Sequence, residues 1–223
     1  MLFEHKKGGL EVEFQKFQKI PRLSRICTIT EKIDGSNGQI DIISHNDFYN
    51  NFNLPENEES DVIRERFLKQ YCLGISKEGL YMFAGSRKRW LTPDKQWDNY
   101  GFAQWVKENS EELFKLGEGR HFGEWWGKGI NRGYGMPDNK FHLFNVAKWG
   151  SNEVRPSCCG VVPVIYEGIF DTHWISEALR SLHVNGSIVA PGYMNPEGIV
   201  IFHKASSQLF KKTIVGDENP KNE

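Results

Sequence analysis

Short apolar runs of strand length dominate this chain. β-branched and aromatic residues are concentrated in them, which predicts strands rather than helices. The expected strands cover 26–30, 39–44, 80–84, 141–147, 188–190, 198–203 and 208–215. Three longer segments instead repeat apolar residues every three or four positions and predict helices. The expected helices cover 60–72, 101–116, and a segment that starts after residue 171 or 172 and reaches about 182. The mixture predicts an α+β fold, with antiparallel sheets flanked by helices.

Breaker and polar residues indicate how the chain is organised. No internal repeat and no low-complexity linker divides it, so residues 1–223 are expected to form a single domain. The stretch 45–60, rich in Asn, Asp and Glu, is predicted to be a polar surface loop or a mobile insertion. The polar end, 216–223, is predicted to be a flexible tail.

Composition narrows the class of protein without indicating a function. Apolar residues make up 39% of the 223 and charged residues 26%, as is ordinary for a soluble globular protein. No run of about eighteen apolar residues predicts a membrane span, and residues 1–9 lack the apolar core of a signal peptide, so a cytoplasmic protein with no membrane association is expected. The four cysteines form no C-x-x-C pair, which argues against a zinc site and favours reduced thiols.

The formal net charge of −1 argues against bulk electrostatic binding to nucleic acid. It leaves room for a local basic groove, for which Arg87-Lys88-Arg89 and Lys211-Lys212 are candidates. Either cluster is equally compatible with solvated surface charge.

The most informative segment is Thr30 to Gly38, where a predicted strand ends in Lys32 and a polar turn follows. A lysine held there on a rigid element can attack a phosphate if neighbouring cations, a metal or burial favour its neutral form. Asp34-Gly35 is also a common turn signal, so a hairpin with an exposed lysine remains the alternative from this segment alone.

Later segments add groups suited to a nucleotide. Glu124, inside the aromatic and glycine-bracketed stretch 122–127, offers a carboxylate for a ribose hydroxyl or a metal-bound water. Phe144, in the alternating stretch 141–146, could stack on a base, although an aromatic stripe is more often core. Glu197 precedes a buried strand, and Lys211 and Lys212 could bind phosphates as point charges.

Together these segments resemble the ordered motifs of the covalent nucleotidyltransferase superfamily, which holds ATP-dependent DNA ligases, RNA ligases and messenger-RNA capping enzymes. Glu31 to Gly35 resembles its K-x-D-G motif I. The arginine motif is matched by 85–87, motif III by 122–127, motif IIIa by 143–146, motif IV by 197–201 and motif V by the segment at Lys211, with intervals of roughly 55, 37, 20, 53 and 14 residues. The resemblance spans about residues 20 to 215.

Within the superfamily the chain looks most like the RNA ligases of the phage type, because Ser36 and Asn37 match their polar G-[ST]-N continuation of motif I. Two positions depart from the pattern. Motif V often reads K-x-K but is Lys211-Lys212-Thr213 here, so Lys211 is the main expected phosphate contact and Lys212 a substitute. Motif IIIa often carries Asp where this chain has Asn145.

The resemblance implies an ATP-grasp-like ligase adenylylation domain without a C-terminal OB domain, joining 5′-phosphate and 3′-hydroxyl RNA ends through a covalent lysyl-AMP. It implies Lys32 as the nucleophile, ATP and Mg²⁺ (or Mn²⁺) as cofactors, and Glu197 and Glu124 as metal contacts through water. The other nucleotide-binding residues it implies are Glu31 at the adenine edge, Ile33, Asn37 at the acceptor phosphate, Arg87 and Glu124 at the ribose, Phe144 stacked on adenine, and Lys211 and Lys212 at the α-phosphate. Lys221 would reach the leaving pyrophosphate.

Three alternatives remain open at this stage. The domain could instead serve a small DNA ligase acting on DNA or a mixed duplex, or a guanylyltransferase. It could also be a non-catalytic module that binds nucleic acid. Because no further domain follows motif V in this sequence, a partner protein for end recognition is a further expectation.

Overall fold

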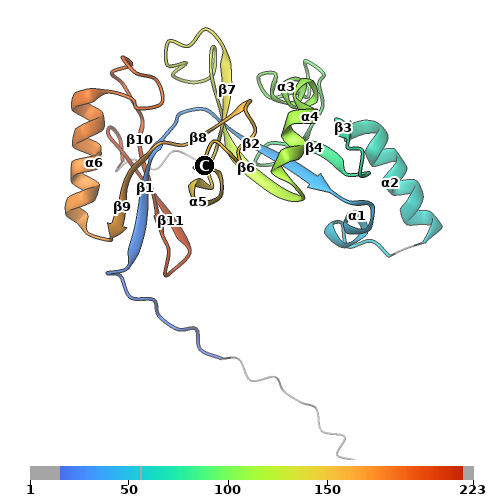
Figure 1. Ribbon diagram of the computed structural model, residues 1–223, viewed down its shortest axis with the longest axis horizontal. Coiled ribbons are helices and arrows are strands. Elements are labelled where there is room, and N and C mark those ends of the chain that lie inside the picture. The colour runs from blue at the N-terminus through green and yellow to red at the C-terminus, as the bar shows by residue number, and fades with distance from the viewer. Residues whose placement is uncertain (1–15, 56, 218–223) are drawn as a thin grey trace, which may run out of the picture.

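The computed structural model describes residues 16–55 and 57–217, which form two mainly antiparallel sheets flanked by helices (Figure 1). This confirms the mixed α+β prediction in its broad form. The first nine residues, most of the predicted tail (218–223) and Lys221 lie outside the described residues. Within the described part of the chain, no helix is long and apolar enough to cross a membrane.

The smaller sheet has the strand order β11-β10-β1-β9, and all its neighbours are antiparallel. Its strands are β1 (Ile26–Lys32), β9 (Val164–Ile169), β10 (Gly198–His203) and β11 (Gln208–Thr213). Helix α6 (Thr172–Asn185) covers one face and begins at Asp171, whose carboxylate accepts from the His173 N–H. Cys27, Ile29, Ile199 and Ile201 point toward α6, so alternate residues of β1 and β10 point to the opposite face.

The larger sheet has the order β3-β4-β2-β6-β7-β8, with β5 paired to β4. Its strands are β2 (Ser36–Ile43), β3 (Gly74–Ile75), β4 (Tyr81–Gly85), β5 (Trp90–Leu91), β6 (Gly119–Gly127), β7 (Asn139–Leu143) and β8 (Cys159–Val161). Only β7 and β8 are parallel among these pairs of the described chain. Helices α3 (Phe102–Glu108) and α4 (Ser110–Leu113) cover one face through Phe102, Val106 and Leu113.

Helices α1 (His45–Asn51) and α2 (Glu58–Tyr71) pack on the opposite face of the larger sheet, at the end away from α6 (Figure 1). The predicted loop over 45–60 is therefore wrong. Ser44 caps α1 by accepting from the Asp47 N–H, and Phe48 and Tyr49 are buried, so two apolar side chains anchor an otherwise polar segment.

Three further predictions need correction. The expected helix over 101–116 breaks at Asn109 into α3, α4 and the 3-10 turn Phe114–Leu116. The expected strand 141–147 ends at Leu143, because Asn145 caps the short helix α5 (Val146–Trp149) by accepting from the Lys148 N–H at 3.1 Å. The expected strand 188–190 is a turn, whose amides bind a side chain of the site described below.

Candidate functional site

Lys32 lies where the chain passes from one sheet to the other. It is the last residue of β1, pairs with Gly198 of β10, and is followed within four residues by β2. Its Nζ lies 2.5 Å from Oε2 of Glu197, whose side chain is only 4% exposed, against 23% for the lysine. The nearly buried carboxylate therefore fixes the ammonium at the junction of the two sheets.

The turn after Lys32 packs directly against β6, and this explains the glycine in K-x-D-G. A Cβ at Gly35 would lie 2.5 Å from the Trp125 carbonyl oxygen and 2.8 Å from Cβ of Trp126. The Gly35 N–H donates to Oε1 of Glu124 at 3.1 Å, and Asn37 pairs with Glu124 across the ladder. The close approach of the two backbones thus brings the Glu124 carboxylate beside motif I.

Glu124 is electrostatically coupled to the ion pair. Burial raises its pKa from 4.5 to about 7. The Lys32 ammonium and the Gly35 hydrogen bond lower the pKa, and the carboxylates of Glu197 and Asp34 raise it further. Lys32, Glu124 and Glu197 therefore form one interacting cluster.

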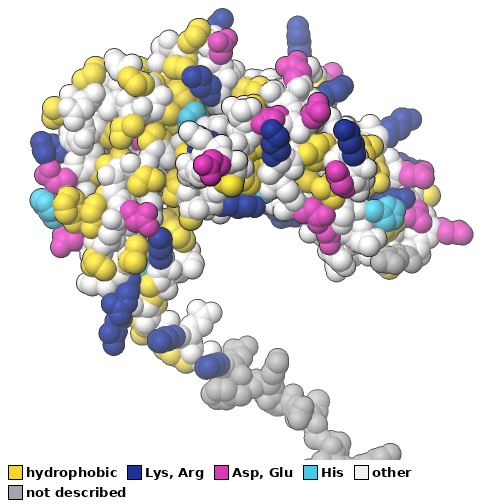
Figure 2. All heavy atoms as spheres, viewed as in Figure 1, with side chains coloured by type: hydrophobic (Ala, Val, Ile, Leu, Met, Phe, Trp, Pro, Cys, Tyr) yellow, Lys and Arg dark blue, Asp and Glu magenta, His cyan; other side chains and the backbone are white. Residues whose placement is uncertain are grey.

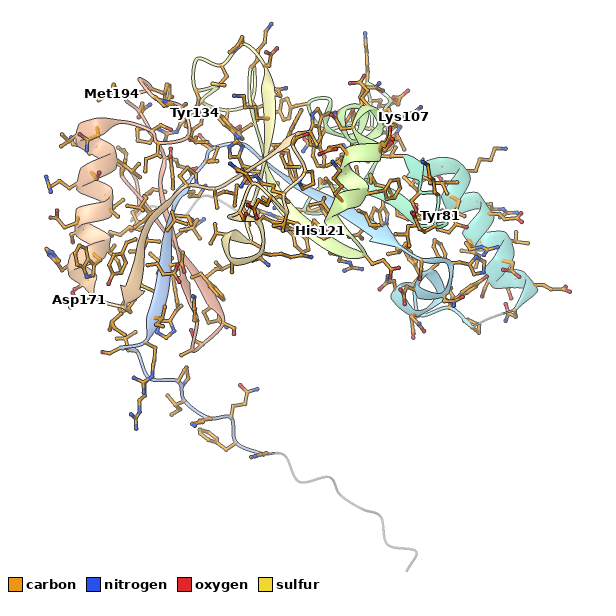
Figure 3. The ribbon with its side chains drawn as sticks, viewed as in Figure 1. Tyr81, Lys107, His121, Tyr134, Asp171 and Met194 are labelled. Atoms are coloured by element: carbon orange, nitrogen blue, oxygen red, sulfur yellow. The ribbon has the colours of Figure 1, made fainter. Side chains whose placement is uncertain are left out.

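A clamp formed by residues 131–134 holds the motif I turn, and sequence analysis missed it. Arg132 Nε donates to Asp34 Oδ2 at 2.9 Å, and Asn131 Nδ2 donates to the Gly35 carbonyl at 2.6 Å. The Asp34 N–H donates to the Tyr134 hydroxyl at 2.8 Å (Tyr134 is labelled in Figure 3). This loop shows no hydrophobic period, and its glycines and Asn131 gave only a turn signal.

The same arginine also reaches the segment before β10 that carries Glu197. Arg132 Nη1 donates to the backbone carbonyl and to Oδ1 of Asn195, both at 2.9 Å. Asn195 stands two residues before Glu197. One guanidinium thus ties the turn after the candidate nucleophile to the segment before its carboxylate partner.

Glu31 does not join the cluster, although it precedes Lys32. Adjacent strand residues point to opposite faces, and Glu31 is only 1% exposed on the α6 side. Its carboxylate accepts from Ser187 Oγ at 2.5 Å and from the Ile188 and Val189 amides at 2.8 and 2.9 Å. Its side chain therefore holds the turn after α6 instead of standing free for an adenine edge, and strand alternation alone would have indicated this.

The Ile33 side chain also packs in a hydrophobic core. It is buried in a small core with Trp126, Tyr134 and Val162, so its contribution is to seat the motif I turn.

The two late lysines lie on opposite faces of the smaller sheet. Lys211 pairs with Val200, and Val200 pairs with Thr30, so these three side chains point to the same face. Lys32 is two residues after Thr30 in β1 and points to that face as well, so Lys211 shares the face of Lys32. Lys212 pairs with Ile199, which points to α6. The structure therefore brings Lys211 to the Lys32 face and does not bring Lys212 there.

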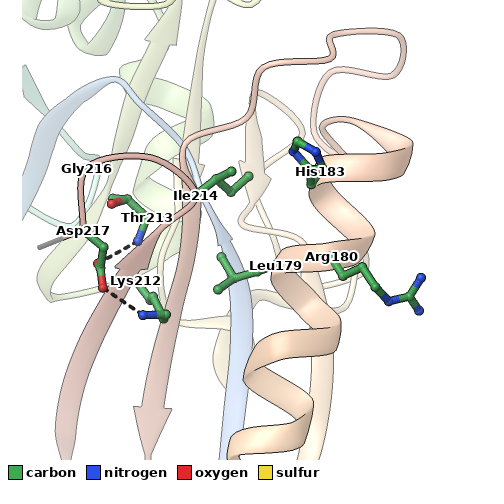
Figure 4. A pocket seen from close by; sticks show the side chains of 8 residues that line it. All are labelled: Leu179, Arg180, His183, Lys212, Thr213, Ile214, Gly216 and Asp217. Carbon is green, nitrogen blue, oxygen red and sulfur yellow. Dashed lines mark hydrogen bonds and ion pairs between the residues drawn. The ribbon is translucent and has the colours of Figure 1, made fainter.

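Lys212 instead borders a hollow of about 680 Å³ between α6 and β11, shown in Figure 4. Its Nζ donates to Asp217 at 3.0 Å. The hollow lies on the α6 side of the smaller sheet, away from the Lys32 face, so it is not the site of the cluster.

Two other predicted residues lie on the larger sheet. Phe144 follows β7, donates its N–H to the Phe122 carbonyl at 2.9 Å and is 40% exposed. Along β6, Trp125 points to the core, so Phe122 and Glu124 point to the opposite face of the sheet. Phe144 lies beside Phe122 and therefore shares the face of Glu124. Arg87 is exposed in the turn between β4 and β5, where no ion pair engages it within the described residues.

The described residues contain no group of three or more His, Cys, Asp or Glu that could hold a metal ion. The four cysteines are free thiols. Glu124 and Glu197, which interact with each other and with Lys32, supply two carboxylates. Such a pair fits a hydrated Mg²⁺ or Mn²⁺, which keeps several waters and takes its remaining ligands from phosphate oxygens.

The chain is similar to known proteins in sequence and in fold. The family model described as RNA ligase matches residues 25–213. No match is found among curated proteins. Among solved structures, a mutant RNA ligase of Naegleria gruberi with ATP and Mn superimposes with a TM-score of 0.51 at 15% identity, covering 85% of this chain and 49% of that one.

A second mutant of the Naegleria gruberi enzyme, in its apo form, gives a TM-score of 0.47 at 16% identity over 85% of this chain and 50% of its own. The chain thus spans about half the length of these ligases. The first likeness concerns the fold, whereas the family model covers most of the sequence, including every residue of the Lys32 cluster. The chain therefore belongs to the RNA ligase family.

Proposed function

We propose that this protein is an ATP-dependent RNA ligase that works through a covalent lysyl-AMP at Lys32, on a nucleotidyltransferase fold. The observation that carries the proposal is the cluster itself. A lysine at the end of a rigid strand is held by a nearly buried carboxylate, with a second carboxylate beside the following turn. A purely structural ion pair would need neither the second carboxylate nor the clamp on the turn.

The proposed reaction has three displacements. Neutral Lys32 Nζ bonds to the α-phosphorus of ATP and loses a proton, and pyrophosphate leaves. The oxygen of an RNA 5′-phosphate then bonds to the same phosphorus, and the lysine amine takes up a proton and leaves. Finally the 3′-hydroxyl of a second end attacks the activated 5′-phosphate, loses its proton and expels AMP. The lysine splits one difficult displacement into easier ones.

The residues have separate parts in this scheme. A divalent cation would neutralise charge on the phosphates. Glu197 and Glu124 would hold it through water, and Glu197 would then exchange its ion pair with Lys32 for this task. Lys211 would balance the α-phosphate from the Lys32 face, Asn37 would seat the acceptor phosphate, and Phe144 and Arg87 would contact adenine and ribose. That the similar Naegleria gruberi ligase was solved with ATP and Mn supports these cofactors.

The test is to incubate the purified protein with ATP labelled at the α-phosphate and Mg²⁺, and to follow label bound to protein. Lys32→Arg is the key variant, because it keeps a cation opposite Glu197 but offers no amine for a stable bond to AMP. Lys77→Ala, at an exposed lysine, is the matched control. We expect label on wild type and on the control only. Equal label on Lys32→Arg would overturn the assignment of the nucleophile.

Substrate class is tested separately on the labelled protein. Transfer of AMP to a nicked RNA duplex or an RNA single strand supports the RNA ligase proposal. Transfer only to nicked DNA would favour the small DNA ligase alternative, and label from GTP instead of ATP would favour a guanylyltransferase. Absence of label from either nucleotide would leave the non-catalytic nucleic-acid-binding module. Ligation that requires an added protein would support a partner for end recognition.

A further inference from the structure

The segment between β4 and α3 displays aromatic rings and cations that the proposed chemistry does not use. Trp97 is 54% exposed and Tyr100 is 56% exposed, although large aromatic side chains are normally well covered. Lys88 and Lys95 are exposed in the same segment. We define these four residues as the 88–100 patch. It precedes α3, which is labelled on the upper right of Figure 1.

Tyr100 is held in its exposed position by the fold. Its φ is 52°, in the left-handed region that a bulky residue rarely adopts. Its carbonyl accepts from Trp125 Nε1 at 3.0 Å and from Asn139 Nδ2 at 3.5 Å. The backbone is thus fixed by two side chains of the larger sheet, while the ring stays out of the core.

Trp97 is likewise presented on a fixed loop. Arg89 Nη1 donates to the Trp97 carbonyl at 2.5 Å, and the guanidinium lies 5.7 Å from the centre of the indole ring. This cation–π contact leaves more than half of the tryptophan surface open. The ring is therefore preorganised and still available to a ligand.

The charges of the segment favour an anionic ligand. Residues 86–100 contain four basic and two acidic residues. Both acids are turned onto backbone amides: Asp94 accepts from the Gln96 N–H at 2.8 Å, and Asp98 accepts from the Asn99 and Ala103 N–H groups at 2.6 and 2.7 Å. Charges of both signs are interspersed over the face that Figure 2 shows. The segment 86–100 itself has more basic than acidic residues.

The patch is connected to motif I. Asn99 Nδ2 donates to Ser36 Oγ at 2.6 Å, and Ser36 is the first residue of β2, four positions after Lys32. The residue next to Tyr100 therefore contacts the start of β2, close to the turn that follows the candidate nucleophile.

We propose that the 88–100 patch binds unpaired RNA next to the ends to be joined, with bases stacked on Trp97 and Tyr100 and phosphates beside Lys88 and Lys95. Stacking rings combined with cations are the usual surface for a single strand, because every base has a π-face and every phosphate a charge. The inference deepens the proposed function, on which it rests, by assigning a single-stranded segment to the substrate.

The test measures RNA binding without ATP, so its outcome does not depend on whether Lys32 forms a bond to AMP. Fluorescence anisotropy follows a labelled twelve-nucleotide RNA titrated with Trp97→Ala, Tyr100→Gly and the double variant. Glycine removes the ring and adopts the left-handed backbone conformation of position 100 without strain, so the substitution should not prevent folding. Trp174→Ala, in the exposed tryptophan of α6, is the matched control.

We expect each patch variant to weaken binding roughly ten-fold and the double variant more strongly, since a stacked base contributes that order of affinity. Tyr100→Phe should restore binding, because stacking needs the ring and not the hydroxyl. Lys88→Ala with Lys95→Ala should make binding less dependent on salt, unlike Lys69→Ala with Lys77→Ala. Wild-type affinity in the double aromatic variant would overturn the proposal. It would also be overturned if a fully paired RNA bound more tightly than the unpaired RNA and the variants did not weaken that binding.

Discussion

The raised pKa of Glu124 makes the stability of the protein depend on pH in a direction that can be worked out. Burial is the main cause, and it penalises the charged form of the carboxylate. The perturbation is Glu124→Gln, which keeps a similar shape and an oxygen for the Gly35 N–H but never carries a charge. The variant therefore isolates the effect of ionising this side chain.

The magnitude follows from the two pKa values. The folded value is about 7 and the ordinary value is 4.5, and each pH unit between them corresponds to about 1.36 kcal/mol. Below pH 4.5 the side chain is protonated in both folded and unfolded protein. Between the two values only the unfolded chain ionises, so stability is lost as pH rises. Above pH 7 the loss is complete, on the order of 3 kcal/mol.

The assay is urea unfolding of both proteins between pH 4.5 and 8, at constant ionic strength and without ATP or divalent cations, which would stabilise the folded state by binding. The free energy of unfolding of wild type minus that of Glu124→Gln should fall by about 3 kcal/mol across this range and then level off. Glu118→Gln, in the exposed residue before β6, is the control and should show no such trend. A difference that stays constant, or that rises with pH, would refute the reasoning.

Three further predictions concern other parts of the site. Lys211→Ala should lower AMP labelling at least ten-fold while Lys212→Ala changes it little, because only Lys211 shares the face of Lys32. Equal losses of labelling rate in the two variants would contradict the strand register. Arg132→Ala should slow labelling about 100-fold, the effect expected if the motif I turn is misplaced by about 1 Å. The surface variant Arg180→Ala should label at the wild-type rate. An unchanged single-turnover rate in Arg132→Ala would show that the clamp has no part in the mechanism. Glu31→Ala should lower the free energy of unfolding by about 3 kcal/mol, since the buried Ser187 hydroxyl and the part-buried Ile188 and Val189 amides lose their acceptor. Unfolding at the wild-type urea midpoint would show that the turn after α6 does not need this carboxylate.

The sequence by itself determined several local elements and the residues that make up motif I. The apolar period predicted α6, and the β-branched run predicted β1 with Lys32 at its end. These features depend on neighbours in the chain, because helix and strand periods and caps are local properties. The same locality explains an error: the polar composition of 45–60 concealed the two buried anchors of α1.

Only the tertiary structure decided which side chains share the site. Nothing local separates Lys211 from Lys212, since the choice depends on the pairing of β11 with β10 and of β10 with β1. Arg132 is 98 residues from Asp34 in sequence, and no pattern in its glycine-rich loop predicts that it joins Asp34 to Asn195. One residue of strand register reverses the face of every side chain, and long-range packing fixes that register. The sequence therefore predicts some residues of a site, but the fold decides which of them lie together.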